Sequence, residues 1–222
     1  MNLVSILIIF SSTIVITILW LQLGLPDDTG SMIALWLVLA SISIALQLGY
    51  TLYLLYRSTN TTRVEKFVRR HKKHPYYAYV LAYIEGNLQE QKRHLERMKS
   101  SGKYGQVKAL GLTSIYLEEG NVPAAKNEAA HIKIPDAAAY TQALIALHEK
   151  DWDSFHHWQQ KVTSKPLSIV LQAEEAFATG NMPEADRLAE EAIRHAYGLQ
   201  RLLLIRAREL KQKQTEHRKT YF

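Results

Sequence analysis

Histidine and carboxylate side chains are the residues of this chain that could hold a metal ion or transfer a proton. The sequence has nine histidines. His71 and His74 have a helical spacing, but two lysines lie between them and their positive charge disfavours a bound cation. His156 and His157 are adjacent, so a helix would point them at different parts of its surface. No H-E-x-x-H motif or carboxylate–histidine cluster is present, and we therefore expect no metal site and no cofactor.

Adjacent carboxylates are the next candidates, because an acid and a base can share one reaction. Neighbouring residues diverge by about 100° around a helix, so each such pair is expected to lie on a solvated face. The chain has no cysteine, which excludes disulfides, thiolate zinc sites and cysteine nucleophiles. Phosphate-binding, dinucleotide-binding and nucleophile-elbow glycine motifs are also missing. No catalytic residue is nominated, and the chain is not expected to be an enzyme. The adjacent pairs are Glu118–Glu119, Glu174–Glu175 and Glu190–Glu191.

Two long apolar segments open the chain. Leu3–Leu25 and Met32–Tyr56 contain no charged side chain. At about 1.5 Å per residue, each can cross a hydrocarbon core of about 30 Å. The sequence therefore predicts a two-helix membrane anchor over residues 1–56, with spans at about 3–25 and 32–56. Cleavage of the first segment as a signal peptide is disfavoured, since its short leading region is uncharged and no A-x-A-like site follows.

Basic residues predict which side of the membrane the rest of the chain occupies. Residues 57–74 contain seven Lys or Arg and one acid, whereas the loop 26–31 contains no Lys or Arg. The positive-inside rule then places the N-terminus and the C-terminal domain in the cytoplasm, with the loop outside. The compact layout favours a bacterial cell membrane. Such clusters also attract anionic lipid headgroups, although their use as topology signals alone would explain them. The candidate lipid contacts are Arg57, Arg63, Lys66, Arg69, Arg70, Lys72 and Lys73.

Three small residues in the second apolar segment could bring helices together in the membrane. Ser41, Ala45 and Gly49 are spaced by four residues and share one helix face. Small side chains allow a second helix to approach closely. We expect this face to pack against the first span, with dimerisation as the alternative.

From Pro75 onward, apolar residues recur at three- and four-residue spacings, which predicts helix throughout. Glu85-Gly86-Asn87 recurs as Glu119-Gly120-Asn121 and as Thr179-Gly180-Asn181, and Lys150-Asp151-Trp152 occupies the equivalent place between the last two. Each glycine can end one helix in the left-handed conformation, and the short residue after it can start the next. The expected helices are 75–86 with 88–100, 104–119 with 122–132, 136–149 with 152–163, 166–179 with 183–197, and a ninth at about 198–216.

The run from Ala173 to Ala192 resembles a tetratricopeptide repeat, with small residues where paired helices touch and Gly180 at the turn. The resemblance covers roughly residues 75–197 as four helix pairs. It departs from the family pattern at Gln91, where a small residue is expected, and at Lys150-Asp151-Trp152. Together with the two apolar segments and the basic residues after them, it predicts an all-α chain. A transmembrane hairpin and a basic linker (57–74) precede a tetratricopeptide-like α-solenoid (75–197) and a capping helix with a basic tail (198–222). Residues expected to share one face of the second helices are Ala125, Ala129, Ile132, Ala185, Ala189 and Ala192.

Arrays of this family usually bind peptide segments on a concave face lined by the first helix of each pair, so the resemblance implies a partner-binding groove. The groove would be aromatic and aliphatic with a few polar groups, which suits an amphipathic segment. The alternative is that some of these residues close the core of a tightly wound array. The groove residues are Tyr76, Val80, Tyr83, Leu110, Ser114, Leu117, Thr141, Ile145, His148, Val170, Glu174 and Phe177.

These features predict a membrane-anchored adaptor or scaffold that holds a protein partner, of unknown identity, at the membrane. The alternative is a structural or regulatory subunit of a larger membrane complex that makes its contacts through the spans. An enzyme with an unrecognised site is the least favoured alternative. A nucleic-acid partner is not expected, since no nucleic-acid module is recognisable. The C-terminal basic cluster (Arg201 to Lys219) is expected to be a solvated helix end, with a lipid or acidic-partner contact as the alternative.

Overall fold

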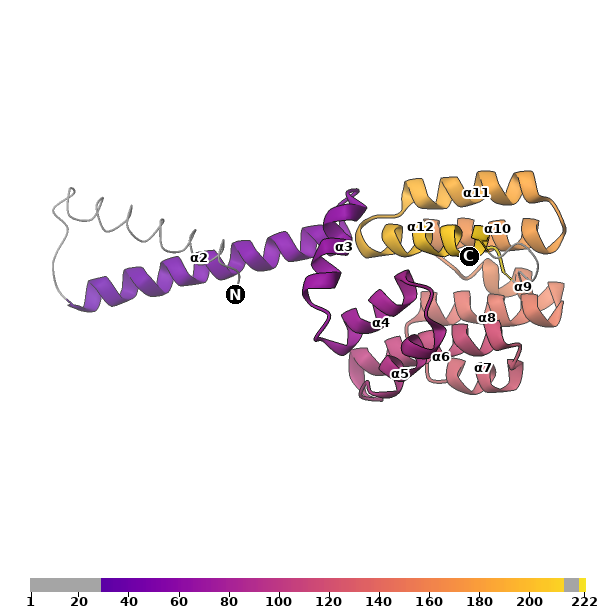
Figure 1. The fold of residues 1–222 in the computed structure, drawn as a ribbon, viewed down its shortest axis with the longest axis horizontal. Helices are drawn as coiled ribbons and strands as arrows, with labels where there is room; N and C mark the ends of the chain where they lie inside the picture. Colours follow the sequence, from indigo (N-terminus) through magenta and orange to yellow (C-terminus); the bar gives the residue numbers. More distant parts are fainter. Residues whose placement is uncertain (1–28, 214–219) are drawn as a thin grey trace. The chain divides into compact units, whose positions relative to one another are not determined.

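The computed structural model describes residues 29–213 and 220–222, with side chains from residue 36 onwards. The described residues form helices and no strand, which confirms the all-α prediction for this part of the chain (Figure 1). The chain divides into two units, residues 1–53 and 54–222, and each is described by itself. The helices are α2 (Thr29–Tyr56), α3 (Thr61–Arg70), α4 (Pro75–Ile84), α5 (Leu88–Glu96), α6 (Gly102–Glu119), α7 (Val122–Ala129), α8 (Pro135–Glu149), α9 (Trp152–Gln159), α10 (Lys165–Ala178), α11 (Met182–His195) and α12 (Gly198–Lys213).

α2 contains the segment that is long and apolar enough to cross a membrane. This segment, Trp36–Tyr56, has 21 residues and a mean hydropathy of 1.7, and it is the one such helix among the described residues. The hydroxyls of Ser41 and Thr51 donate to the carbonyl oxygens four residues earlier, at 2.7 and 2.9 Å, so the helix itself satisfies these two hydroxyls. The structure thus gives one candidate span where the sequence predicts two, because the first, Leu3–Leu25, lies outside the described residues.

Residues 75–195 form four helix pairs, α4 with α5, α6 with α7, α8 with α9 and α10 with α11. The turn within three of the pairs ends the first helix at a glycine of positive φ, and in the third pair Lys150 takes this conformation at a φ of 60°. The Asn or Asp that follows accepts a hydrogen bond from a backbone N–H at the start of the second helix, which caps that helix. The turn that recurs in the sequence is therefore formed in all four pairs. The capping residues are Asn87, Asn121, Asp151 and Asn181.

Small side chains lie where the two helices of a pair touch. Ala125 and Ala129 of α7 are 0% and 3% exposed, and Ala185, Ala189 and Ala192 of α11 are all 0% exposed. Alanine buries little surface by itself, but it lets the helix backbones approach and exclude water from the larger side chains around it. The predicted faces of these two helices are confirmed. In the third pair Phe155 of α9 fills the corresponding space and is fully buried.

α12 packs on both the first and the last helices of the array. It contacts α11, as a cap on the last pair would, and it also contacts α3 and α4. Leu202 of α12 is buried in one cluster with Val64 and Val68 of α3 and with Val80 and Ile84 of α4. Residues 54–222 therefore form one compact body in which the C-terminal helix returns to the first helices (Figure 1).

The start of α12 lies directly against the chain that leaves α2. The Gly198 N–H donates to the Ser58 carbonyl oxygen at 2.7 Å. Gly198 has a φ of +53°, and a Cβ at this position would lie 1.9 Å from the Leu55 carbonyl oxygen. Glycine is the residue that meets both requirements, because it has no side chain and adopts positive φ without steric cost.

Candidate peptide-binding site

The predicted groove residues divide into a buried half and a partly open half. The buried residues pack against the domain's own side chains, so they cannot contact a partner directly in this conformation. Ser114 is exposed, and the remaining five are partly buried. Their role in partner binding stays a prediction. The six buried residues are Val80, Leu117, Thr141, Ile145, Val170 and Glu174.

Glu174 is the buried residue that packing alone does not explain. It lies near the C-terminal end of α10 and is 2% exposed. An unpaired carboxylate in such a place would be costly, so its oxygens need donors. The donors come from far along the chain, because the Tyr221 N–H donates to one carboxylate oxygen at 2.7 Å and the Phe222 N–H donates to the other at 2.9 Å. One buried carboxylate thus holds two consecutive backbone amides.

The segment Thr220–Phe222, called the tail below, also inserts an aromatic side chain into the domain. Tyr221 is 1% exposed and lies in the hydrophobic cluster between α10 and α11. Its ring meets Phe177 edge-on, with the ring centroids 6.0 Å apart. Its hydroxyl donates to Asp186, a short hydrogen bond at the N-terminal part of α11. Phe222 is partly buried against the same cluster, 5.3 Å from the Tyr221 ring. Main-chain and side-chain contacts together therefore hold the tail in an aromatic pocket.

Basic residues of α12 balance the acids around this site. The Lys211 ammonium pairs with Glu118 of α6, and Lys211 is 9% exposed. The Arg208 guanidinium lies 3.6 Å from Asp186 and 3.3 Å from Glu190. The expectation that the C-terminal basic residues form a solvated helix end is therefore wrong for these two, because each binds a carboxylate of the domain.

Burial raises the pKa of the two central groups of the site, the Glu174 carboxyl and the Tyr221 hydroxyl. Burial raises the pKa of Glu174 to about 7, while the Tyr221 and Phe222 amides and the charge of Lys211 act in the opposite direction. Burial and the hydrogen bond to Asp186 raise the pKa of Tyr221 to about 12, so its hydroxyl stays protonated and can donate. The site is thus built to accept N–H and O–H donors from an extended segment.

Two tyrosines bring α4 and α8 to the same site. Burial, followed by the nearby charges of Glu118 and Glu174, raises the pKa of Tyr83. Burial and the charge of Glu174 raise the pKa of Tyr140, which also packs against the cluster that contains Tyr221. Side chains of α8, α10, α11 and α12 therefore lie in one cluster with the tail. We call this set, centred on Glu174 and Phe177, the Glu174 site.

Sequence reasoning found part of this site and missed its occupant. Tyr83, Glu174 and Phe177 were on the predicted groove, placed there by the repeat spacing. Asp186 lies on a second helix, and the tail was assigned to a basic segment, so neither was included. The signal in the sequence was Tyr221-Phe222, two aromatic residues that follow a strongly polar stretch.

The predicted lipid contacts lie on and beside α3. Val64 and Val68 bury one face of α3 in the domain, so this helix does not present an apolar face to a membrane surface. The Arg69 guanidinium pairs with Glu65 at 2.9 Å and with Glu85 at 3.0 Å. The other six basic residues are exposed, and their contact with lipid remains a prediction. The small residues Ser41, Ala45 and Gly49 of α2 are exposed in the described part of the chain, and their predicted neighbour, the first span, lies outside it.

In the described part of the chain, His94 lies 3.4 Å from Glu90 and His156 lies 3.7 Å from Glu175, each beside a single carboxylate. No group of three or more His, Cys, Asp or Glu side chains there is placed to hold a metal ion. His71 contacts the Phe67 carbonyl oxygen at 2.8 Å, and His74 accepts from the Tyr76 N–H as the cap of α4. These contacts stabilise helix ends.

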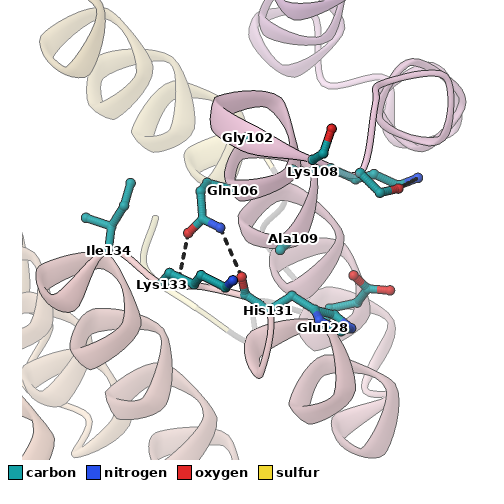
Figure 2. Close-up of a pocket in the computed structure, with 11 residues that line it drawn as sticks. Gly102, Gln106, Lys108, Ala109, Glu128, His131, Lys133 and Ile134 are labelled. Carbon is teal, nitrogen blue, oxygen red and sulfur yellow. Dashed lines mark hydrogen bonds between the residues drawn. The ribbon is translucent and has the colours of Figure 1, made fainter.

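A second hollow lies between the start of α6 and the loop from α7 to α8 (Figure 2). It has a volume of about 770 Å³, and Gln106 lies at its centre. The Gln106 amide donates to the His131 carbonyl oxygen at 3.0 Å and accepts from the Lys133 N–H at 2.6 Å. Lys108 reaches the Glu96 carbonyl oxygen and the Ser100 hydroxyl. The hydrogen bonds of Gln106 therefore hold the loop between α7 and α8 against α6. The polar groups that line the hollow do not point toward a common ligand position.

Comparison with protein-family models, with curated proteins and with solved structures found no match to this chain. The tetratricopeptide resemblance stays an inference from the residues and their spacing.

Proposed function

We propose that this protein is a membrane-anchored adaptor whose helical domain binds an extended segment of a partner protein at the Glu174 site. The single observation that supports this function most is the capture of the tail: two consecutive amides on one buried carboxylate, with a tyrosine ring in the adjoining pocket. Recognition through main-chain amides suits a peptide-binding module, because it fixes an extended backbone while pockets choose the side chains.

The anchor in this proposal is α2, and its role is to restrict the partner to the membrane. The apolar segment Trp36–Tyr56 supports this by its length and composition. We further propose that the domain faces the cytoplasm, as the basic residues after Tyr56 favour. Because Leu54 in the last turn of α2 is buried in the domain, the domain begins where the apolar segment ends.

Site-specific photo-crosslinking in native membranes tests the adaptor function. A photoreactive phenylalanine analogue replaces Phe177, which borders the tail, or, as the control, Trp152 at the exposed start of α9. The proposal expects a protein partner linked from position 177 and not from position 152. Partners linked equally from both positions, or from neither, would contradict an adaptor that uses the Glu174 site and would turn attention to α2.

A further inference from the structure

We propose that the tail is a resident, displaceable ligand of the Glu174 site, and that the partner segment shares its chemistry: two consecutive aromatic residues with free backbone N–H groups. This inference deepens the proposed function and rests on it. It identifies the class of segment that the site takes, and it makes the protein's own chain a competitor for that segment.

The tail has the contacts of a bound peptide. Its two amides donate to Glu174, its first aromatic ring is buried beside Phe177, and the Thr220 hydroxyl donates to the Phe222 carbonyl oxygen at 2.8 Å. The Thr220–Phe222 hydrogen bond lies within the tail, and the other contacts join two consecutive residues to α10. A separate segment of the same chemistry can therefore make all of them.

The contacts also define what the site rejects. Proline at either aromatic position would remove an N–H that Glu174 needs, and leave a buried carboxylate oxygen without a donor. Asp186 and Glu174 both face the segment, so an acidic side chain in place of Tyr221 would meet two carboxylates.

Covalent connection gives the tail an advantage over a free segment. The tail belongs to the same chain as Glu174, so its binding is intramolecular and does not depend on the protein concentration. A free segment binds only while the tail is released, so its apparent affinity falls by the released fraction. A segment that binds weakly or is present at low concentration therefore does not displace the tail.

The primary test uses the full chain in detergent micelles and a fluorescent peptide of residues 214–222 as the probe. The wild-type chain is compared with Tyr221→Ser/Phe222→Ser, called the tail-disabled chain, which removes both aromatic rings and the Asp186 contact but keeps the backbone N–H groups and the chain length. We expect the probe to bind the double variant at least about tenfold more tightly than the wild type. Equal affinity for the two chains would overturn the resident-ligand proposal, and so would an absence of binding to the correctly folded variant.

Two matched controls distinguish recognition of the amide donors by Glu174 from non-specific hydrophobic binding of the probe. The first is a probe with N-methyl groups on its Tyr and Phe amides, which keeps both rings and removes both donors. The second compares Glu174→Gln with Glu175→Gln in the tail-disabled chain, because Glu175 lies next along α10 and contacts Gln159 and His156. We expect about tenfold or greater loss with the methylated probe and with Glu174→Gln, and no loss with Glu175→Gln. Undiminished binding of the methylated probe would overturn the recognition of the main chain.

A measurement on the wild-type chain keeps the test independent of how the variants fold. In a chain labelled with ¹⁵N-Tyr and ¹⁵N-Phe, excess unlabelled probe should move the amide signals of Tyr221 and Phe222 to their free positions. Unmoved signals at saturating probe would overturn displacement. If the peptide binds but no partner is crosslinked in membranes, the adaptor function fails and this inference about the site stands. The reverse result would keep the adaptor and reject the ligand class.

Discussion

The buried carboxylate of Glu174 should make the domain less stable as the pH rises from 5 to 8. The pKa of this group is raised from an ordinary value of 4.5 to about 7 in the folded protein, with burial as the main cause. A raised pKa means that the folded state holds a proton that the unfolded state has already lost. The contribution to stability is therefore fully present below pH 4.5 and is lost as the pH rises through about 7.

The size of the effect follows from the shift. One pKa unit corresponds to about 1.4 kcal/mol, so a shift from 4.5 to about 7 is worth about 3 kcal/mol between the two ends of the range. Burial raises this pKa, and the backbone N–H groups of Tyr221 and Phe222 and the charge of Lys211 oppose the rise.

The assay is urea unfolding of the domain in mild detergent at several pH values, followed by circular dichroism. Glu174→Gln removes the titrating group. The unfolding free energy of this variant should therefore lose the part of the pH dependence that comes from the Glu174 carboxyl. All other titratable groups are present in both proteins, so their contributions cancel in the difference between the two slopes. Glu175→Gln is the matched control and should keep the wild-type slope. Identical slopes in wild type and Glu174→Gln would refute the burial argument.

Three further substitutions test the packing that positions the site, each by thermal or urea unfolding in the same detergent. Gly198→Ala should destabilise the domain by about 2–4 kcal/mol, since its Cβ would strike the Leu55 carbonyl oxygen and its φ is +53°; an unchanged stability would contradict this close approach. Lys150→Gly should stabilise it by up to about 1 kcal/mol, because glycine adopts a φ of 60° without strain, and a loss of stability would argue against the left-handed turn. Asn181→Ala should cost about 1 kcal/mol by removing the cap of α11, whereas no cost would show that the cap is absent.

The sequence was sufficient for the turns between paired helices because these depend on short spacings, whereas α3 (Thr61–Arg70) lies in the segment that was predicted as a basic linker. The recurring Gly-Asn turn predicts where a helix ends and the next begins, and both residues act within a few positions of themselves. The turn at Lys150 forms without the glycine. Lys150 takes the left-handed conformation in its place, Asp151 caps α9, and the two helices still pair.

Long-range contacts were beyond the same reasoning. Nothing in the spacing of α12 indicates that Leu202 packs against α3 and α4, because that contact joins opposite ends of the domain. Glu174 lies at the predicted register, but its partner amides are 47 and 48 residues away in the sequence. An acid on a helix is usually solvated, and only the position of the tail shows that this one is buried and paired.

The most direct measurement of the central claim is the exchange of the Tyr221 and Phe222 amide protons in the full chain. The wild type and Glu175→Ala should protect both amides strongly, whereas Glu174→Ala should let both exchange at the rate of an unstructured peptide. Fast exchange of these two amides in the wild type would contradict the account, because the tail would then not be bound at Glu174.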